Sequence, residues 1–237
     1  MTGELRITYY SMSELPFTVE QFFQVFEAYN ESVWPAHFIG YGLGIWALFL
    51  AVSSKKDYTK FVNRILAVFW VWMGIMYHMV FFSTINSAAY VFGALFVIQG
   101  AGFLILNHGE QPFRFAFKRD AYGISGLIMI VYAMALYPIL GYFMGHTYPQ
   151  VPVFGVAPCP TVIFTFGLLL WTVGRIPNML PVIPALWSLL GFSAAWQLGV
   201  YEDFGLVIAG IWGTGMILYR NHRLKTLKQS RPISYEA

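Results

Sequence analysis

The chain has 237 residues, of which 58% are hydrophobic and 11% are charged, whereas an average soluble domain has roughly 25% charged residues. The net charge of +3 is the small difference between two oppositely charged groups of segments, so it does not indicate a nucleic-acid partner. A single cysteine, Cys159, excludes an intramolecular disulfide.

The N-terminal segment, residues 1–31, is expected to lie outside the membrane. Residues 17–31 predict an amphipathic helix, because Thr18 and Gln21 have the spacing of a capping box. Its aromatic residues recur on one side and its acidic residues face elsewhere; the aromatic residues are Phe22, Phe23, Phe26 and Tyr29. We expect this helix to cap the outer end of a helical bundle.

Residues 32–219 form the predicted membrane domain. Five stretches in it contain no Asp, Glu, Lys or Arg, and two of them are long enough for two spans each. We therefore predict an all-α, polytopic fold with seven transmembrane helices, at about 34–52, 64–82, 88–107, 122–143, 155–173, 180–199 and 204–220. Residues 220–237 would form a basic cytoplasmic tail.

The positions of the basic residues predict the orientation. If successive spans alternate in direction, 13 of the 14 Lys and Arg residues fall on one face, and only Arg6 falls on the other. Because short cytoplasmic loops are enriched in Lys and Arg, this pattern predicts an outer N-terminus and a cytoplasmic C-terminus. A lipid bilayer is therefore an expected partner.

The first three spans share features with the last three. Trp34-Pro35-Ala36 opens the first span and Cys159-Pro160-Thr161 opens the fifth, and a Trp with a Gly four residues later recurs in the second and sixth spans. A parallel repeat of three spans, one linker span and three spans would explain this, with Pro35 and Pro160 as paired hinges. The alternatives are chance similarity between apolar segments and ordinary prolines at helix starts.

Polar and aromatic side chains near the predicted spans could bind a solute. The sequence predicts His78 and Gln99 as polar contacts of a site between the two triplets, because ionisable groups inside a membrane are usually functional. Interhelical hydrogen bonding is the alternative role. The remaining predicted lining residues are Trp70, Trp187, Trp196, Gln197, Asn86 and Tyr90.

Three potential metal ligands, His37, His78 and Cys159, fall at a similar predicted depth. Imidazole and sulfur ligands suit copper or zinc, so a metal- or haem-binding redox protein is an alternative to a transporter. However, no ligand pair has the spacing of a known metal motif. A buried histidine bonded to the backbone, and a cysteine acting as a small apolar residue, would explain the same residues, and the leading interpretation requires no cofactor.

Three segments resemble a family of bacterial multi-pass membrane proteins of unassigned function: LPFTVEQFFQVFEAYNESVWPAH, INSAAYVFGALFVIQG and PCPTVIFTFGLLLW. The resemblance implies an inner-membrane location and no known activity. The order of spans is also similar to that of the SWEET and PQ-loop facilitators, although the Pro-Gln pair of those proteins is absent from the first and fifth spans here. The one Pro-Gln pair, Pro149-Gln150, lies in a predicted outer loop.

The leading prediction is therefore a facilitator for a small neutral or weakly polar solute. The sequence shows no catalytic serine triad, paired carboxylates or phosphate-binding glycine loop, so an enzyme is less favoured. Glycine-rich helix faces would also permit a homo-oligomer or an accessory subunit of a larger membrane complex.

Overall fold

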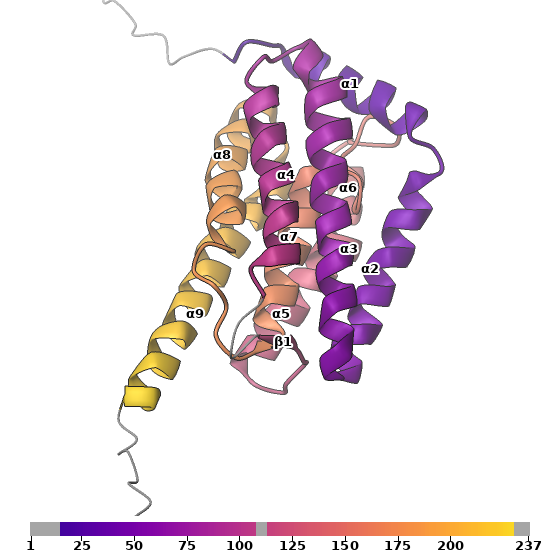
Figure 1. Cartoon of the computed structure of the whole chain (residues 1–237). Helices are drawn as coiled ribbons and strands as arrows, with labels where there is room; N and C mark the ends of the chain where they lie inside the picture. Colours follow the sequence, from indigo (N-terminus) through magenta and orange to yellow (C-terminus); the bar gives the residue numbers. More distant parts are fainter. Residues whose placement is uncertain (1–14, 108–112, 230–237) are drawn as a thin grey trace, which may run out of the picture.

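A computed structural model describes residues 15–107 and 113–229, and most of the chain is helical. The helices form an elongated bundle, with α1 (Val19–Ser32) lying across one end (Figure 1). The bundle helices are α2 (Ala36–Ser53), α3 (Thr59–Trp72), α4 (Ala89–Ile105), α5 (Ala121–Val131), α6 (Tyr137–Phe143), α7 (Pro158–Leu170), α8 (Val182–Leu198) and α9 (Phe204–Gln229).

Two of these helices contain π-helical turns. The segment η2 (Met73–Phe81) continues α3 and is followed by the 3-10 turn η3 (Phe82–Thr84), while η4 (Tyr132–Leu136) joins α5 to α6. Two further 3-10 turns, η1 (Lys56–Tyr58) and η5 (Tyr201–Asp203), precede α3 and α9. Single π-helical turns are rare and often mark functional sites.

Every predicted span contains a helix at nearly the predicted position. Three continuous helical segments are long and apolar enough to cross a membrane, namely Ala36–Ser53, Thr59–Thr84 and Ala121–Phe143, and three shorter helices are also apolar. The last helix differs from the prediction, because α9 continues to Gln229 through residues expected in the tail. The basic residues Arg220, Arg223 and Lys225 lie in this part of α9.

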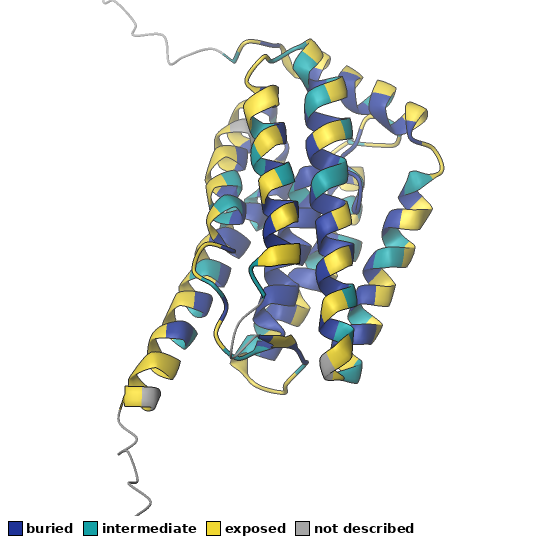
Figure 2. Cartoon of the chain, viewed as in Figure 1, coloured by how far each residue is buried: buried dark blue, intermediate teal, exposed yellow. Residues whose placement is uncertain are grey.

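The short helix α7 lies in the centre of the bundle. Its residues from Pro160 to Leu170 are all buried, and buried positions concentrate along this part of the molecule in Figure 2. It packs against α5, α8 and α9. A helix that is apolar on all sides is suited to such a position.

The two ends of the bundle are held by polar contacts that the all-helical prediction did not include. At one end, β1 (Arg114–Phe115) pairs antiparallel with β2 (Thr172–Val173). The amide of Phe115 also donates to Thr59 Oγ1 at 3.2 Å. This ladder satisfies backbone groups of two loops that would otherwise be buried without partners.

At the other end, α1 packs on the bundle as predicted. Thr18 and Gln21 form the expected capping box, and Phe22, Phe26 and Tyr29 are buried in an apolar cluster with residues of η2, α8 and the loop before α7. The Tyr29 hydroxyl donates to the carbonyl oxygen of Val156 at 2.8 Å. The amphipathic helix is therefore an integral part of the bundle.

Candidate functional site

An acidic pair is buried where α8 turns into α9. Glu202 and Asp203 occupy η5, and their relative exposures are only 1% and 4%. Helix α9 begins at the next residue, so the positive end of its dipole lies beside both carboxyl groups and favours their charge. Burial opposes that charge strongly unless other groups compensate.

Asp203 contacts two further polar side chains of the cluster. The Tyr137 hydroxyl donates to Asp203 Oδ1 at 2.5 Å, and the Cys159 thiol also interacts with this carboxyl. Burial, together with a smaller effect of the neighbouring Glu202, raises the pKa of Asp203 to about 7, although hydrogen bonds from Tyr137 and Cys159 lower it. This carboxyl can therefore exchange a proton near neutral pH.

Glu202 connects the cluster to the surface. Its Oε1 lies 2.8 Å from His146 Nδ1, and the His146 side chain is 14% exposed whereas that of Glu202 is fully enclosed. The ring of Phe23 in α1 lies on His146 with a centroid distance of 4.8 Å. Glu202 Oε2 is buried without a hydrogen-bond partner in the described part of the chain, and such an atom in a native protein requires an explanation.

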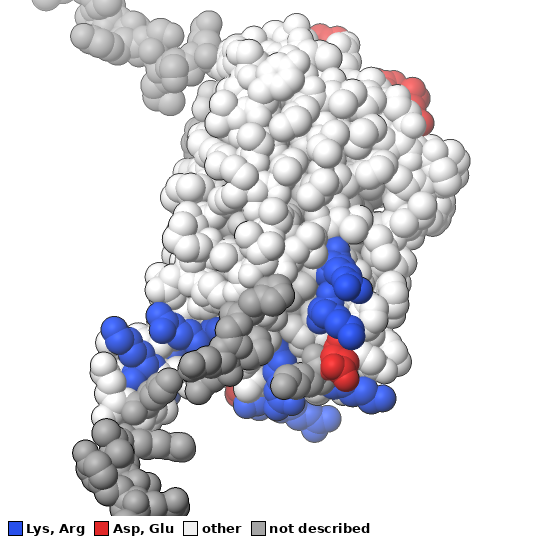
Figure 3. All heavy atoms as spheres, viewed as in Figure 1, with Lys and Arg blue, Asp and Glu red and all other residues white. Residues whose placement is uncertain are grey.

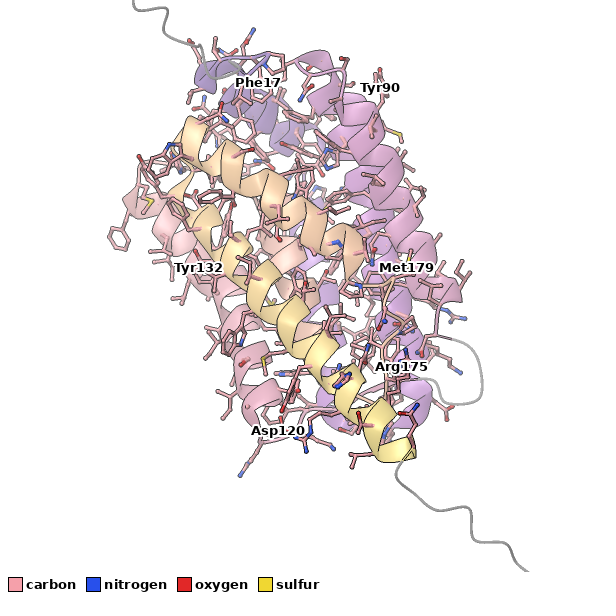
Figure 4. The ribbon with its side chains drawn as sticks, turned by 90° about the vertical axis from the view of Figure 1, so that its left-hand side faces the viewer. Phe17, Tyr90, Asp120, Tyr132, Arg175 and Met179 are labelled. Atoms are coloured by element: carbon pink, nitrogen blue, oxygen red, sulfur yellow. The ribbon has the colours of Figure 1, made fainter. Side chains whose placement is uncertain are left out.

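Glycines allow the acidic turn to approach its neighbours closely. A Cβ placed on Gly141 in α6 would lie 3.1 Å from Glu202 Oε1, and one on Gly205 would lie 2.2 Å from the ring of Tyr132. With a glycine at position 205, the Tyr132 ring packs directly on the start of α9, and its hydroxyl donates to the carbonyl oxygen of Glu202 at 2.6 Å. Figure 4 shows Tyr132 on this side of the bundle, next to α9.

The π-helical turn η4 explains how two tyrosines reach the same site. Tyr132 and Tyr137 are five residues apart, so in a regular α-helix they would point about 140° away from each other. A π-helical turn bonds residue i to i+5 and brings such residues closer to one face. Their ring centroids are 6.3 Å apart, and both hydroxyls bond to η5.

A second polar group lies deeper, in the other π-helical segment. His78 in η2 is completely buried, and neither of its ring nitrogens has a hydrogen-bond partner among the described residues. Its ring lies 4.6 Å from that of Phe96 and 4.9 Å from that of Trp187, between centroids. Trp187 in turn interacts with Cys159, although its indole N–H has no acceptor within hydrogen-bonding distance. His78 is thus linked through Trp187 and Cys159 to Asp203.

The structure brings four of the predicted site residues into the interior. His78 and Trp187 meet directly. Gln99 donates to the carbonyl oxygen of Leu180 at 2.9 Å, and the Trp70 indole donates to Thr165 Oγ1 at 3.1 Å. Gln99 therefore makes a hydrogen bond between segments of the bundle, of the kind given as its alternative role, and Trp70 makes one between α3 and α7.

The other predicted lining residues do not face this interior. Trp196, Gln197 and Tyr90 are exposed, and Figure 4 shows Tyr90 on the outside of the bundle. Asn86 Oδ1 accepts from the Ala88 amide within the link between η3 and α4. Of the two predicted hinge residues, Pro35 directly precedes α2, and Pro160 lies in the first turn of α7.

Of the three predicted metal ligands, His37 lies apart from the other two. His37 Nε2 lies 3.0 Å from Asn30 Oδ1 near the junction of α1 and α2, whereas His78 and Cys159 each contact Trp187. Within residues 15–107 and 113–229, no group of three or more His, Cys, Asp and Glu side chains is placed to hold a metal ion.

Sequence reasoning missed the residues at the centre of the site. Glu202 and Asp203 fall in the short predicted loop between the spans at 180–199 and 204–220, and no sequence pattern predicts a role for Tyr132, Tyr137 or His146. One signal was available: the acidic pair directly precedes the apolar run of α9. Two acidic residues that directly precede a predicted span, with no polar linker between these residues and the span, indicate carboxyl groups near the bundle interior.

Comparison with known proteins identifies a family but no activity. The chain matches the family of unknown function DUF6064 over residues 19–228, and it therefore belongs to that family. No curated protein and no solved structure matches it. The similarity to the SWEET and PQ-loop facilitators therefore rests on the predicted order of spans alone.

Proposed function

We propose that this member of the DUF6064 family is a seven-span inner-membrane protein with an outer N-terminus and a cytoplasmic C-terminus. In the view of Figure 3, the Lys and Arg side chains gather at the end of the bundle opposite α1. Figure 4 places Asp120 and Arg175 at that end and Phe17 and Tyr90 at the other. Apolar side chains such as Phe38, Phe49 and Ile208 are exposed on the flanks, and large exposed apolar areas are typical of a lipid-facing surface.

This topology has a direct test. Single cysteines placed in a Cys159→Ser background at Ser13 and at Ser234, near the two ends of the chain, would be labelled with a membrane-impermeant maleimide in intact cells and in inverted vesicles. The proposal predicts labelling of position 13 only from outside and of position 234 only from inside. Labelling of both positions from the same side contradicts an odd number of spans and the proposed repeat with it.

We further propose that the protein facilitates the passage of a small neutral or weakly polar solute. The buried polar path from His146 through Glu202, Asp203 and Cys159 to Trp187 is the observation that supports this function. Polar groups are expensive inside an apolar bundle, and most of them have hydrogen-bond partners in native proteins. Among the described residues, an acceptor, Glu202 Oε2, and a donor, the Trp187 N–H, have no hydrogen-bond partner.

The unpaired groups define the class of solute. A molecule with one N–H or O–H group and one acceptor could bond Glu202 and Trp187, while the rings of Phe92 and Phe96 beside Trp187 would contact its apolar part. Binding sites for small molecules commonly combine apolar walls with a few polar groups. His78, which lies within the same aromatic group, would be the innermost polar contact.

Uptake of labelled small alcohols and amides into proteoliposomes tests the proposal. Glu202→Gln and His78→Ala should each lower the initial rate at least several-fold, whereas Trp196→Phe, on the exposed face of the same helix as Trp187, should leave it unchanged. If no solute enters faster than into protein-free liposomes, the transport function is wrong. If uptake occurs but the two interior variants behave like Trp196→Phe, this site is wrong.

The alternative functions have simpler tests. A metal- or haem-binding protein would show a visible spectrum or a stoichiometric metal content after purification, and His37→Ala would reduce it. An accessory subunit would purify as a stable species only together with a larger complex.

A further inference from the structure

A cavity of about 350 Å³ opens at the end of the bundle opposite α1. Residues from the start of α3, the end of α4 and the segment at β1 line it: Asp57, Thr59, Lys60, Asn63, Arg64, Phe103, Leu104, Asn107, Phe113 and Arg114. Its volume lies within the range of small-molecule sites, roughly 300–1,000 Å³. It is distant in the fold from the acidic cluster and does not depend on the proposed transport function.

The charge of this cavity favours an anion. Three basic side chains, Lys60, Arg64 and Arg114, line it against the single carboxyl of Asp57. Within the described residues, none of the three forms a salt bridge; Lys60 and Arg64 lie over the ring of Phe61 instead. Their charges are therefore available to an incoming ligand.

The backbone adds to this preference. Helix α3 begins at Thr59, and its N-cap residue Tyr58 makes no capping hydrogen bond through its side chain. The 3-10 turn η1 continues directly into α3, and the positive end of the helix dipole at this N-terminal end favours an anion. Thr59 and Lys60 of the first turn of α3 lie in the cavity wall.

Two amide side chains indicate that the ligand also carries hydroxyl groups. Asn63 is 6% exposed, and among residues 15–107 and 113–229 neither its Oδ1 nor the Oδ1 of Asn107 has a hydrogen-bond partner. Both residues line the cavity. Since an amide oxygen accepts but does not donate, these atoms suit the hydroxyl groups of a polyol rather than the phosphate oxygens themselves.

From these features we infer that the cavity binds a hydroxyl-bearing phosphate ester, with the phosphate on Arg64 and Arg114 and the hydroxyls on Asn63 and Asn107. Such a group occurs both in anionic lipid headgroups, such as that of phosphatidylglycerol, and in soluble glycerol phosphates. The lipid is favoured, because Leu104 in the cavity wall is also exposed on the flank of α4. An acyl chain could leave the cavity along that apolar side.

The test measures the thermal unfolding of the purified full-length protein in a neutral detergent. One arm adds phosphatidylglycerol, with phosphatidylcholine as its control, and the other adds glycerol 3-phosphate, with glycerol as its control. A ligand that binds only the folded state raises the unfolding temperature as its concentration increases. We expect this rise with phosphatidylglycerol and not with phosphatidylcholine.

Matched charge variants locate the binding. The double variant Arg64→Gln/Arg114→Gln should weaken the apparent affinity by about tenfold or more, since each base near an anionic headgroup contributes about fivefold. Arg175→Gln/Arg223→Gln removes the same charge from exposed positions of the same end of the bundle and should change the affinity less than about threefold. Asn63→Asp, which places a negative charge in the cavity with almost no change in volume, should weaken binding as strongly as the double arginine variant.

Each result has a defined reading. A rise of the unfolding temperature with phosphatidylglycerol alone supports a site for a lipid headgroup. A rise with glycerol 3-phosphate, alone or together with the lipid, supports a site of the same chemistry whose ligand is soluble. Equal weakening by both double variants would show only general attraction to the basic end and would overturn the inference. No response of the wild-type protein in either arm would also overturn it.

Discussion

Replacement of Asp203 by Asn isolates the energetic effect of burying this carboxyl group. Burial raises its pKa from the ordinary value of 3.8 to about 7. Between these two values, the folded protein holds a proton that the unfolded chain has released. Stability must therefore decrease as pH rises through this range, and the contribution of this group becomes constant above pH 7.

The size of the effect follows from the two pKa values. Their difference corresponds to roughly 4 kcal/mol, and roughly 3 kcal/mol of this should be lost between pH 5 and pH 8. Asparagine has nearly the same shape, and its amide oxygen can still accept from the Tyr137 hydroxyl, but it does not ionise. The Asp203→Asn variant should therefore be more stable than the wild-type protein at pH 8, with the advantage shrinking toward pH 5.

Unfolding of the detergent-solubilised protein, followed by tryptophan fluorescence over pH 5 to pH 8, measures this difference. Glu31→Gln, which removes an exposed carboxyl from α1, is the matched control and should follow the wild-type curve. A constant difference between wild type and Asp203→Asn across the pH range would refute the reasoning. So would an Asn variant that is less stable than wild type at pH 8.

Three further substitutions test individual contacts by the same unfolding assay. Tyr137→Phe should destabilise the protein by about 1–3 kcal/mol. The loss should be larger at pH 8 than at pH 5, because in the wild-type protein the Tyr137 hydroxyl stabilises the charged form of Asp203 and so lowers its pKa. An equal loss at both pH values would contradict this. Thr18→Ala should cost about 1 kcal/mol, because it removes the capping box of α1, and an unchanged midpoint would mean that α1 does not unfold with the bundle. Arg220→Met should cost about 1–3 kcal/mol, because the guanidinium donates to Thr172 O and Thr172 Oγ1, both at 2.7 Å; recovery by Arg220→Lys to the wild-type midpoint would argue against this multiple contact.

The sequence could predict the helices because their signals are local. Uncharged stretches of sufficient length mark the apolar helices, the Thr18–Gln21 pair marks the start of α1, and the distribution of bases distinguishes the two ends of the bundle. Each of these signals depends on residues a few positions apart. The structure accordingly has a helix in every range where one was predicted.

The acidic site could not be predicted in the same way, because it depends on contacts between distant residues. Asp203 meets Tyr137 across 66 positions of sequence, and the approach of Tyr132 requires the absence of a side chain at Gly205. Hydropathy alone assigns a carboxyl group beside a predicted span to a loop. Glu202 and Asp203 face the interior because η5 packs against α6 and η4. The π-helical geometry that directs both tyrosines to one face has no established sequence signal.

The amino-acid sequence alone therefore determined which segments are helical and which end of the molecule is basic, since hydrophobicity, helix caps and charge act within each segment. Only the tertiary structure decided that α7 is the enclosed helix, that Glu202 and Asp203 face inward, and that His37 and His78 have separate surroundings. The physical reason is that apolar helices have no polar face to fix their rotation in the sequence. Their orientation is set instead by close packing and by the need of buried polar atoms for partners.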